Sequence, residues 1–224
     1  ITSITGLAAD VLNAVDSQSE MSTAANVAVT VSAGVATAAD LNAIDLATNG
    51  LVNATAVTEI TGSVAAVIDA TNDQAALSTG GAVLVTLDAG AGVAAADLNT
   101  IDGVTTGLVN ATAITSITGL AADVWNAVDV QATMSTAANV AVTVSAGVVP
   151  AATLNSIDGA TTGLVNATAV TTVTGSIAAV TDALNDQAAM STAAAVLVTL
   201  DDVASTATAL NALDALTSGA IDAN

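Results

Sequence analysis

Aspartates recur at one fixed place in this sequence, and their carboxylates offer its most evident chemistry. The motif L-N-x-I/L-D ends in an aspartate each time, and a stretch rich in threonine and glycine follows it. Carboxylates, hydroxyls and carbonyls suit calcium, which takes about six to eight oxygen ligands. The candidate calcium ligands are Asp45, Asp102, Asp158 and Asp214. The glycine-rich calcium repeat and the EF-hand loop are both absent, so the alternative is that each aspartate is a local hydrogen-bonding group at a helix end or turn.

Asparagines form a second recurring set. Asn53, Asn110 and Asn166 each begin an N-A-T triplet, which is the acceptor pattern for N-glycosylation. The alternative is a stack of asparagines that caps exposed backbone at the turns. The same stacking is expected for the asparagines of the L-N-x-I/L-D motif, which are Asn42, Asn99, Asn155 and Asn211.

Composition excludes most catalytic and nucleic-acid-binding classes. The 224 residues include no Lys, Arg, His or Cys, and 20 acids give a net charge of -20. Imidazole bases, thiolates and amine nucleophiles are therefore absent, and a strongly acidic surface repels phosphate. Glycoside hydrolysis would need two convergent carboxylates, but the acids here recur with the repeat and no insertion interrupts it. We expect no enzyme activity, no cofactor apart from calcium and no nucleic-acid partner.

Internal repetition is the strongest signal in the chain. The segment 1–16 returns at 114–129 with one substitution, Leu12 to Trp125. Within that offset of 113, the glycine of a Thr-Gly pair recurs in steps of 56 or 57, at Gly6, Gly62, Gly119 and Gly175. We therefore divide a single continuous array, 1–224, into repeat units of approximately 1–57, 58–114, 115–170 and 171–224.

Each repeat unit contains two β-rich runs and two helical segments. The β-rich runs read V/I-T-x-I/V-T-G or V-x-V-T-V/L, and they predict eight strands at a mean spacing of about 28 residues. The segments between them place apolar residues on one helical face, as with Leu7, Val11 and Val15, or with Leu41 and Ile44. Thr37 followed by Asp40 is typical of a capped helix start, and Pro150 occupies a first-turn position. A short extended stretch is expected after each T-T/N-G turn.

Strand-helix alternation at constant period predicts an α/β solenoid of about eight coils with one parallel sheet. An all-parallel β-helix is the alternative fold. Apolar residues make up 53% of the chain and are almost all small, so we expect a thin core and no membrane span. The position shared by Leu12 and Trp125 should face outward, because a packed interior would not accept both side chains.

Threonine-rich strands raise a further interpretation. A flat hydroxyl array is typical of some ice-binding solenoids, but the two threonines of V-T-x-I-T-G are three residues apart and should face opposite sides of a strand.

The run from Ala28 to Gly62 and its counterparts resemble the repeats of giant cell-surface proteins of marine cyanobacteria, including the type linked to swimming without flagella. The resemblance covers essentially the whole chain and implies an extracellular structural role. That family is often labelled as haemolysin-type calcium-binding, whereas this stretch lacks the glycine-rich nonapeptides. The resemblance supplies no catalytic residues.

A chain that starts at Ile1 and shows no polar capping repeat suggests an excerpt of a longer array. We expect a protease-resistant surface filament, layer or stalk that self-associates end to end or side by side. The alternative is an adhesin or receptor-binding fibre shaft, with a neutral glycan or cell-surface partner bound by domains outside this sequence.

Overall fold

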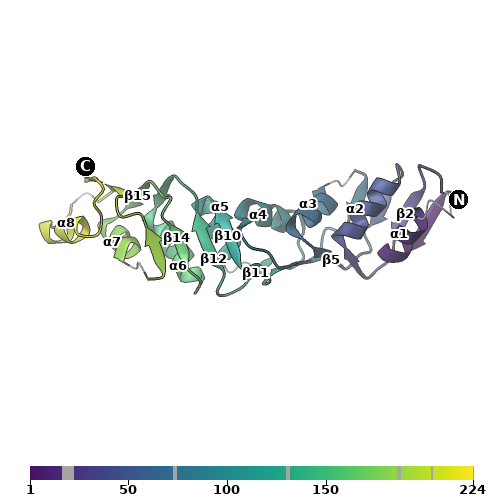
Figure 1. Cartoon of the computed structure of the whole chain (residues 1–224), viewed down its shortest axis with the longest axis horizontal. Helices are drawn as coiled ribbons and strands as arrows, with labels where there is room; N and C mark the ends of the chain where they lie inside the picture. Colours follow the sequence, from purple (N-terminus) through teal and green to yellow (C-terminus); the bar gives the residue numbers. More distant parts are fainter. Residues whose placement is uncertain (17–22, 73–74, 130–131, 186–187, 203, 224) are drawn as a thin grey trace. The chain divides into compact units, whose positions relative to one another are not determined.

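Helices and short strands alternate along the whole chain (Figure 1). The computed structural model describes residues 1–16, 23–72, 75–129, 132–185, 188–202 and 204–223. The expected α/β class is confirmed, and the all-β alternative is excluded by the helices. The described helices are α1 (Ala8–Asp16), α2 (Ala38–Ala47), α3 (Val64–Asn72), α4 (Ala95–Val104), α5 (Ala121–Val128), α6 (Ala151–Ala160), α7 (Ile177–Asn185) and α8 (Ala207–Asp214).

The described strands form four sheets, and the printed pairs are parallel throughout, so the expectation of one sheet built from eight strands is wrong. The first sheet contains β1 (Ser3–Gly6), β2 (Ala28–Val31), β4 (Val52–Ala54) and β6 (Leu77–Thr79). The second contains β3 (Val35–Thr37), β5 (Glu59–Gly62), β7 (Leu84–Leu87), β9 (Val109–Ala111) and β11 (Met134–Thr136). The third contains β8 (Val93–Ala94), β10 (Ser116–Gly119), β12 (Ala141–Val144), β14 (Val165–Ala167) and β16 (Met190–Thr192). The fourth contains β13 (Val148–Pro150), β15 (Thr172–Gly175), β17 (Leu197–Leu200) and β18 (Ile221–Asp222).

One coil, meaning the chain between two paired strands, is shorter than the sequence predicts. Ser3 pairs with Ala28, and Val29 pairs with Val52, so neighbouring strands are 25 or 23 residues apart. A coil closes after one helix and two strands, as from β2 through β3 and α2 to β4. The predicted spacing of about 28 residues counted only two strand types. It missed the short strands β3, β8 and β13 that lead directly into α2, α4 and α6.

Apolar spacing and capping explain where the helices lie. Leu41 and Ile44, three residues apart, are both fully buried on the inner face of α2. The hydroxyl of Thr37 accepts a hydrogen bond from the backbone N–H of Asp40 at 3.0 Å, which confirms the predicted cap. Leu7 was expected on the buried face of α1, but it precedes the helix and is exposed. Pro150 is the N-cap residue of α6 rather than a residue of its first turn.

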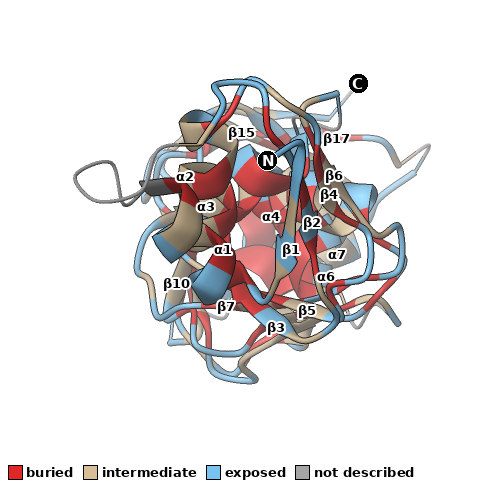
Figure 2. Ribbon diagram, turned by 90° about the vertical axis from the view of Figure 1, so that its right-hand side faces the viewer, coloured by how far each residue is buried: buried red, intermediate tan, exposed pale blue. Residues whose placement is uncertain are grey.

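Contacts divide the chain into two compact units, residues 1–90, 97–113 and 132–135 in the first and the remaining residues in the second. In the first unit α1, α2 and α3 pack in succession, and in the second α5, α6, α7 and α8 do the same. Buried residues, shown in red in Figure 2, gather on the inner sides of helices and strands, whereas exposed ones lie outside. The core is aliphatic, as the composition predicts.

Strand pairing brings unlike repeat positions together. In the first sheet Thr5 pairs with Thr30, Thr30 with Asn53, and Asn53 with Ser78. Coils of 23 to 25 residues do not divide evenly into repeats of 56 or 57, so equivalent residues do not lie above one another. Polar side chains nevertheless stay on one face and apolar ones on the other, because every paired strand keeps the same alternation.

Candidate functional site

The four motif aspartates lie near the C-terminal ends of α2, α4, α6 and α8. Asp45, Asp102 and Asp158 are half-buried, and Asp214 is exposed. Among the residues that the structure describes, no three acids gather in a way that could hold a metal ion. The register instead gives each aspartate different neighbours, so they do not form the stacked column that would supply one calcium ion with several carboxylates.

Asp102 shows the local role that such an aspartate takes. The hydroxyl of Thr133 donates to its Oδ2 at 3.3 Å, across 31 residues of sequence. Its Oδ1 is shielded from solvent and accepts no hydrogen bond from the described residues. A carboxylate near a helix C-terminus also faces the negative end of the helix dipole. These features fit a side chain held by its neighbours better than one arranged around a cation.

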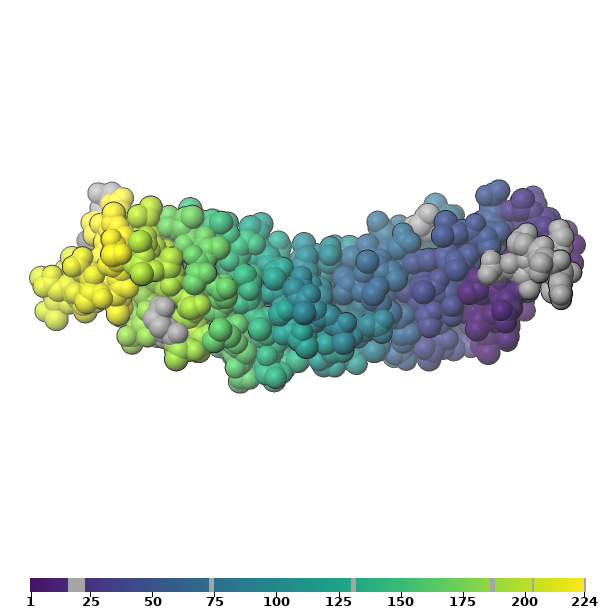
Figure 3. Space-filling view, viewed as in Figure 1, coloured from purple at the N-terminus to yellow at the C-terminus, as the bar shows by residue number. Residues whose placement is uncertain are grey.

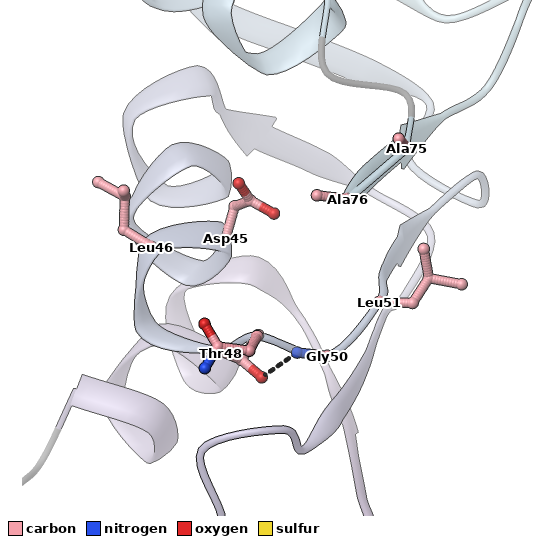
Figure 4. Close-up of a pocket in the computed structure, with 8 residues that line it drawn as sticks. Asp45, Leu46, Thr48, Gly50, Leu51, Ala75 and Ala76 are labelled. Atoms are coloured by element: carbon pink, nitrogen blue, oxygen red, sulfur yellow. Dashed lines mark hydrogen bonds between the residues drawn. The ribbon is translucent and has the colours of Figure 1, made fainter.

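Asp45 faces a surface hollow of about 440 Å³ in the first unit (Figure 4). The hollow lies between the end of α2, the turn that follows it and residues Ala75 and Ala76. Thr48 also lines it, but its hydroxyl is already bonded within the turn. Asp45 is the one acid among the lining residues, so the hollow lacks the pair of titratable groups that general acid-base chemistry requires.

The N-A-T triplets form closed local turns. Asn53 Oδ1 accepts hydrogen bonds from the Thr55 backbone N–H at 3.1 Å and from the Thr55 hydroxyl at 2.7 Å. The same two bonds, with the same distances, join Asn110 to Thr112 and Asn166 to Thr168. The expected capping of turn backbone is therefore present, but the expected stack of asparagines is not, because Asn53 lies between Thr30 and Ser78.

Asparagines of the L-N-x-I/L-D motif join neighbouring helices instead of stacking. Asn42 in α2 donates from Nδ2 to the carbonyl of Ala66 in α3 at 3.0 Å. Asn155 in α6 makes the equivalent bond to Ala179 in α7 at 3.1 Å. Each bond spans 24 residues, which is about one coil, so it links one coil to the next.

A recurring Thr-x-Gly turn is the structural motif that sequence reasoning missed. It follows every second helix, and its members are Thr48–Gly50, Thr105–Gly107, Thr161–Gly163 and Thr217–Gly219. All four threonines are buried. Each hydroxyl donates to a carbonyl in the preceding coil and accepts from the glycine N–H two residues later; for Thr161 these distances are 2.6 Å to Val140 O and 2.9 Å from Gly163 N. The occurrence of T-x-G in all four repeats was the available signal.

Glycine is required in this turn because the two coils nearly touch there. A Cβ on Gly163 would lie 2.6 Å from the carbonyl carbon of Val140 and 2.5 Å from the carbonyl oxygen of Asn139. Gly163 does not have a positive φ, so the close approach of backbone, rather than strain, excludes larger residues. The Thr-x-Gly turn therefore fixes the spacing between coils.

Two residues that break the repeat meet in one hollow of the second unit. Trp125 and Pro150 line a surface hollow of about 410 Å³, together with the largely exposed side chains of Leu120 and Val148. Trp125 and its counterpart Leu12 are each partly exposed, as the substitution predicts. No charged residue lines this hollow. Its chemistry suits a neutral ligand that packs against an indole ring.

Comparison of the chain with protein-family models, with curated proteins and with solved structures gives no match. No helix in the described part of the chain has the length and apolar character needed to cross a bilayer.

Proposed function

We propose that this chain is a non-catalytic structural element of an extracellular filament, layer or stalk, in which the coils continue as one solenoid. The observation that carries the proposal is the fourfold Thr-x-Gly turn, which joins one coil to the preceding coil at the same point in every repeat. Buried hydroxyls and glycines serve coil-to-coil contact at these positions, and the acids recur with the repeat instead of converging.

Charge and composition support an extracellular role. A net charge of -20 without any cation keeps neighbouring molecules apart in water of moderate ionic strength. The absence of Lys and Arg also removes every trypsin site, which suits a surface exposed to secreted proteases. The resemblance to giant cyanobacterial surface proteins points in the same direction.

Two measurements test this structural role. Chains with one, two and three tandem copies of residues 1–224 should increase in contour length by equal steps in electron micrographs. Antibodies against the same residues should label intact cells of the source organism as strongly as permeabilised cells. Labelling confined to permeabilised cells, or tandem copies that resemble separate beads, would contradict the proposal.

The Trp125 hollow favours a second candidate, the shaft of an adhesin. Its ligand would be a neutral glycan, since sugar faces pack on indole rings and no charged group lines the hollow. Trp125→Leu restores the residue found at the equivalent position of the first repeat, Leu12, and should abolish binding on a glycan array without lowering stability. Trp125 fluorescence that no neutral glycan changes would reject this candidate.

A further inference from the structure

We propose that the two terminal surfaces of this chain are complementary, so that a second copy docks head to tail with its strand β1 on the segment before α8. The proposal deepens the structural role proposed above and rests on it. It names the partner, a second copy of this chain, and the register of the contact.

Internal strand pairs define that register. In three places a short strand immediately before a helix pairs with the V/I-T-G strand about one coil later: β3 with β5, β8 with β10 and β13 with β15. Residues 204–206 hold the fourth such position, directly before α8, and belong to no sheet in the described part of the chain. Strand β1 is the fourth V/I-T-G strand and is an edge strand that pairs only with β2. By analogy with Val148 and Thr172, Ala204 of one copy would pair with Ser3 of the next.

Burial shows that both surfaces lack a cover that their internal counterparts have. Val57, Ile114 and Val170 are at most 4% exposed, whereas the equivalent Ile1 is 84% exposed. At the other end α8 lies at the surface of the second unit, drawn in yellow in Figure 3. Leu41, Leu98 and Leu154 are fully buried, but their counterpart Leu210 is partly exposed. Ala38, Ala95 and Ala151 are also fully buried, but their counterpart Ala207 is exposed.

A glycine-alanine contact supplies the shape complementarity. A Cβ on Gly62 would lie 3.2 Å from the Cβ of Ala38, and one on Gly119 would lie 3.1 Å from that of Ala95. The glycine backbone thus packs directly on the first alanine of the helix in the preceding coil. Gly6 and Ala207 are the unmatched members of the two series: the atoms near a Cβ on Gly6 belong only to its own coil. In the docked pair, Gly6 of one copy would pack on Ala207 of the other.

One polar bond completes the interface. Asn42 and Asn155 each donate to a carbonyl in the next helix, four residues after the Thr-Gly glycine. The corresponding donor at the end of the chain is Asn211, and the corresponding acceptor is the backbone carbonyl of Asp10 in the second copy. Because each copy carries a charge of -20, the association should tighten as salt screens the repulsion.

Sedimentation velocity of the 224-residue chain over a range of concentrations, at about 0.15 M and about 1 M sodium chloride, tests the association. Wild type should form dimers and longer chains, and more of them at high salt. Ala207→Glu would bury an unpaired carboxylate in the contact and should weaken association at least about 100-fold. Thr208→Glu is the matched control, because it adds the same charge to the neighbouring, exposed position of α8 and should leave association within about threefold, the screening of one exposed charge.

Cross-linking tests the register. The chain contains no cysteine, so Ser3→Cys and Ala204→Cys introduce single thiols. Mixed and oxidised, they should give a disulfide-linked heterodimer, whereas Asn13→Cys, exposed on α1, should not pair with Ala204→Cys. A folded wild type that stays monomeric, or one that associates without this cross-link, overturns head-to-tail docking. Either result leaves the surface role intact, because antibody labelling and tandem-copy length test that role separately.

Discussion

Two glycine-to-alanine substitutions, four residues apart, should change stability in opposite directions. Gly163 lies in a Thr-x-Gly turn against the preceding coil, whereas a Cβ on Gly159, in α6, would meet no atom within 4 Å. Gly163→Ala should lower the free energy of unfolding, and Gly159→Ala should raise it. Both replacements add one methyl group to the same unit, so the difference isolates the contact between coils.

The structure gives the magnitude. The new methyl group of Gly163→Ala would lie 2.6 Å from the carbonyl carbon of Val140, so the turn must move by about 1 Å to reach van der Waals distance. That shift lengthens the 2.6 Å bond from the Thr161 hydroxyl to Val140 O beyond hydrogen-bonding range. Overpacking costs about 1–3 kcal/mol and a lost buried hydrogen bond about 1–3 kcal/mol, which together give about 2–6 kcal/mol. Gly159→Ala should gain about 0.5–1 kcal/mol as an exposed helical replacement.

Urea denaturation provides the assay. Trp125 is the single tryptophan and lies in the same unit as both glycines, so its fluorescence reports unfolding there, and circular dichroism at the helical minimum reports the helices. The midpoint should fall for Gly163→Ala and rise slightly for Gly159→Ala. Equal midpoints for the two variants, or a more stable Gly163→Ala, would refute the argument that coil spacing is set by this turn.

Three further outcomes are expected. Thr105→Val should lower the free energy of unfolding by about 1–3 kcal/mol, because Val83 O and Gly107 N lose the hydroxyl that joins them, whereas Thr106→Val at the exposed neighbouring position should cost less; equal losses in thermal melts would contradict this. Chelation with EDTA should leave the melting temperature unchanged, since no three acids gather among the described residues; a drop that calcium reverses would show that the motif aspartates bind metal. Trypsin should leave the chain intact even after heating, because it contains no Lys or Arg, and new bands on a denaturing gel would disprove this.

Local patterns were sufficient for the helices. The spacing of Leu41 and Ile44 predicted the buried face of α2, and Thr37 predicted its first residue, because a helical face and a cap depend on residues only three or four positions apart. The same holds for the short strands after the Thr-x-Gly turns, such as β4. The missing strands β3, β8 and β13 are two or three residues long, too short for alternation to be visible.

The sequence alone determined the repeat, its helices, the aliphatic core and the lack of cationic chemistry. Only the tertiary structure decided which residues meet, and it separated the motif aspartates, placed Asn53 between Thr30 and Ser78, and brought Trp125 beside Pro150. The physical reason is that a coil closes where one helix and two strands return the chain to its neighbour, 23 to 25 residues on, whereas the sequence repeats every 56 or 57. Periodicity along the chain therefore does not give periodicity in space.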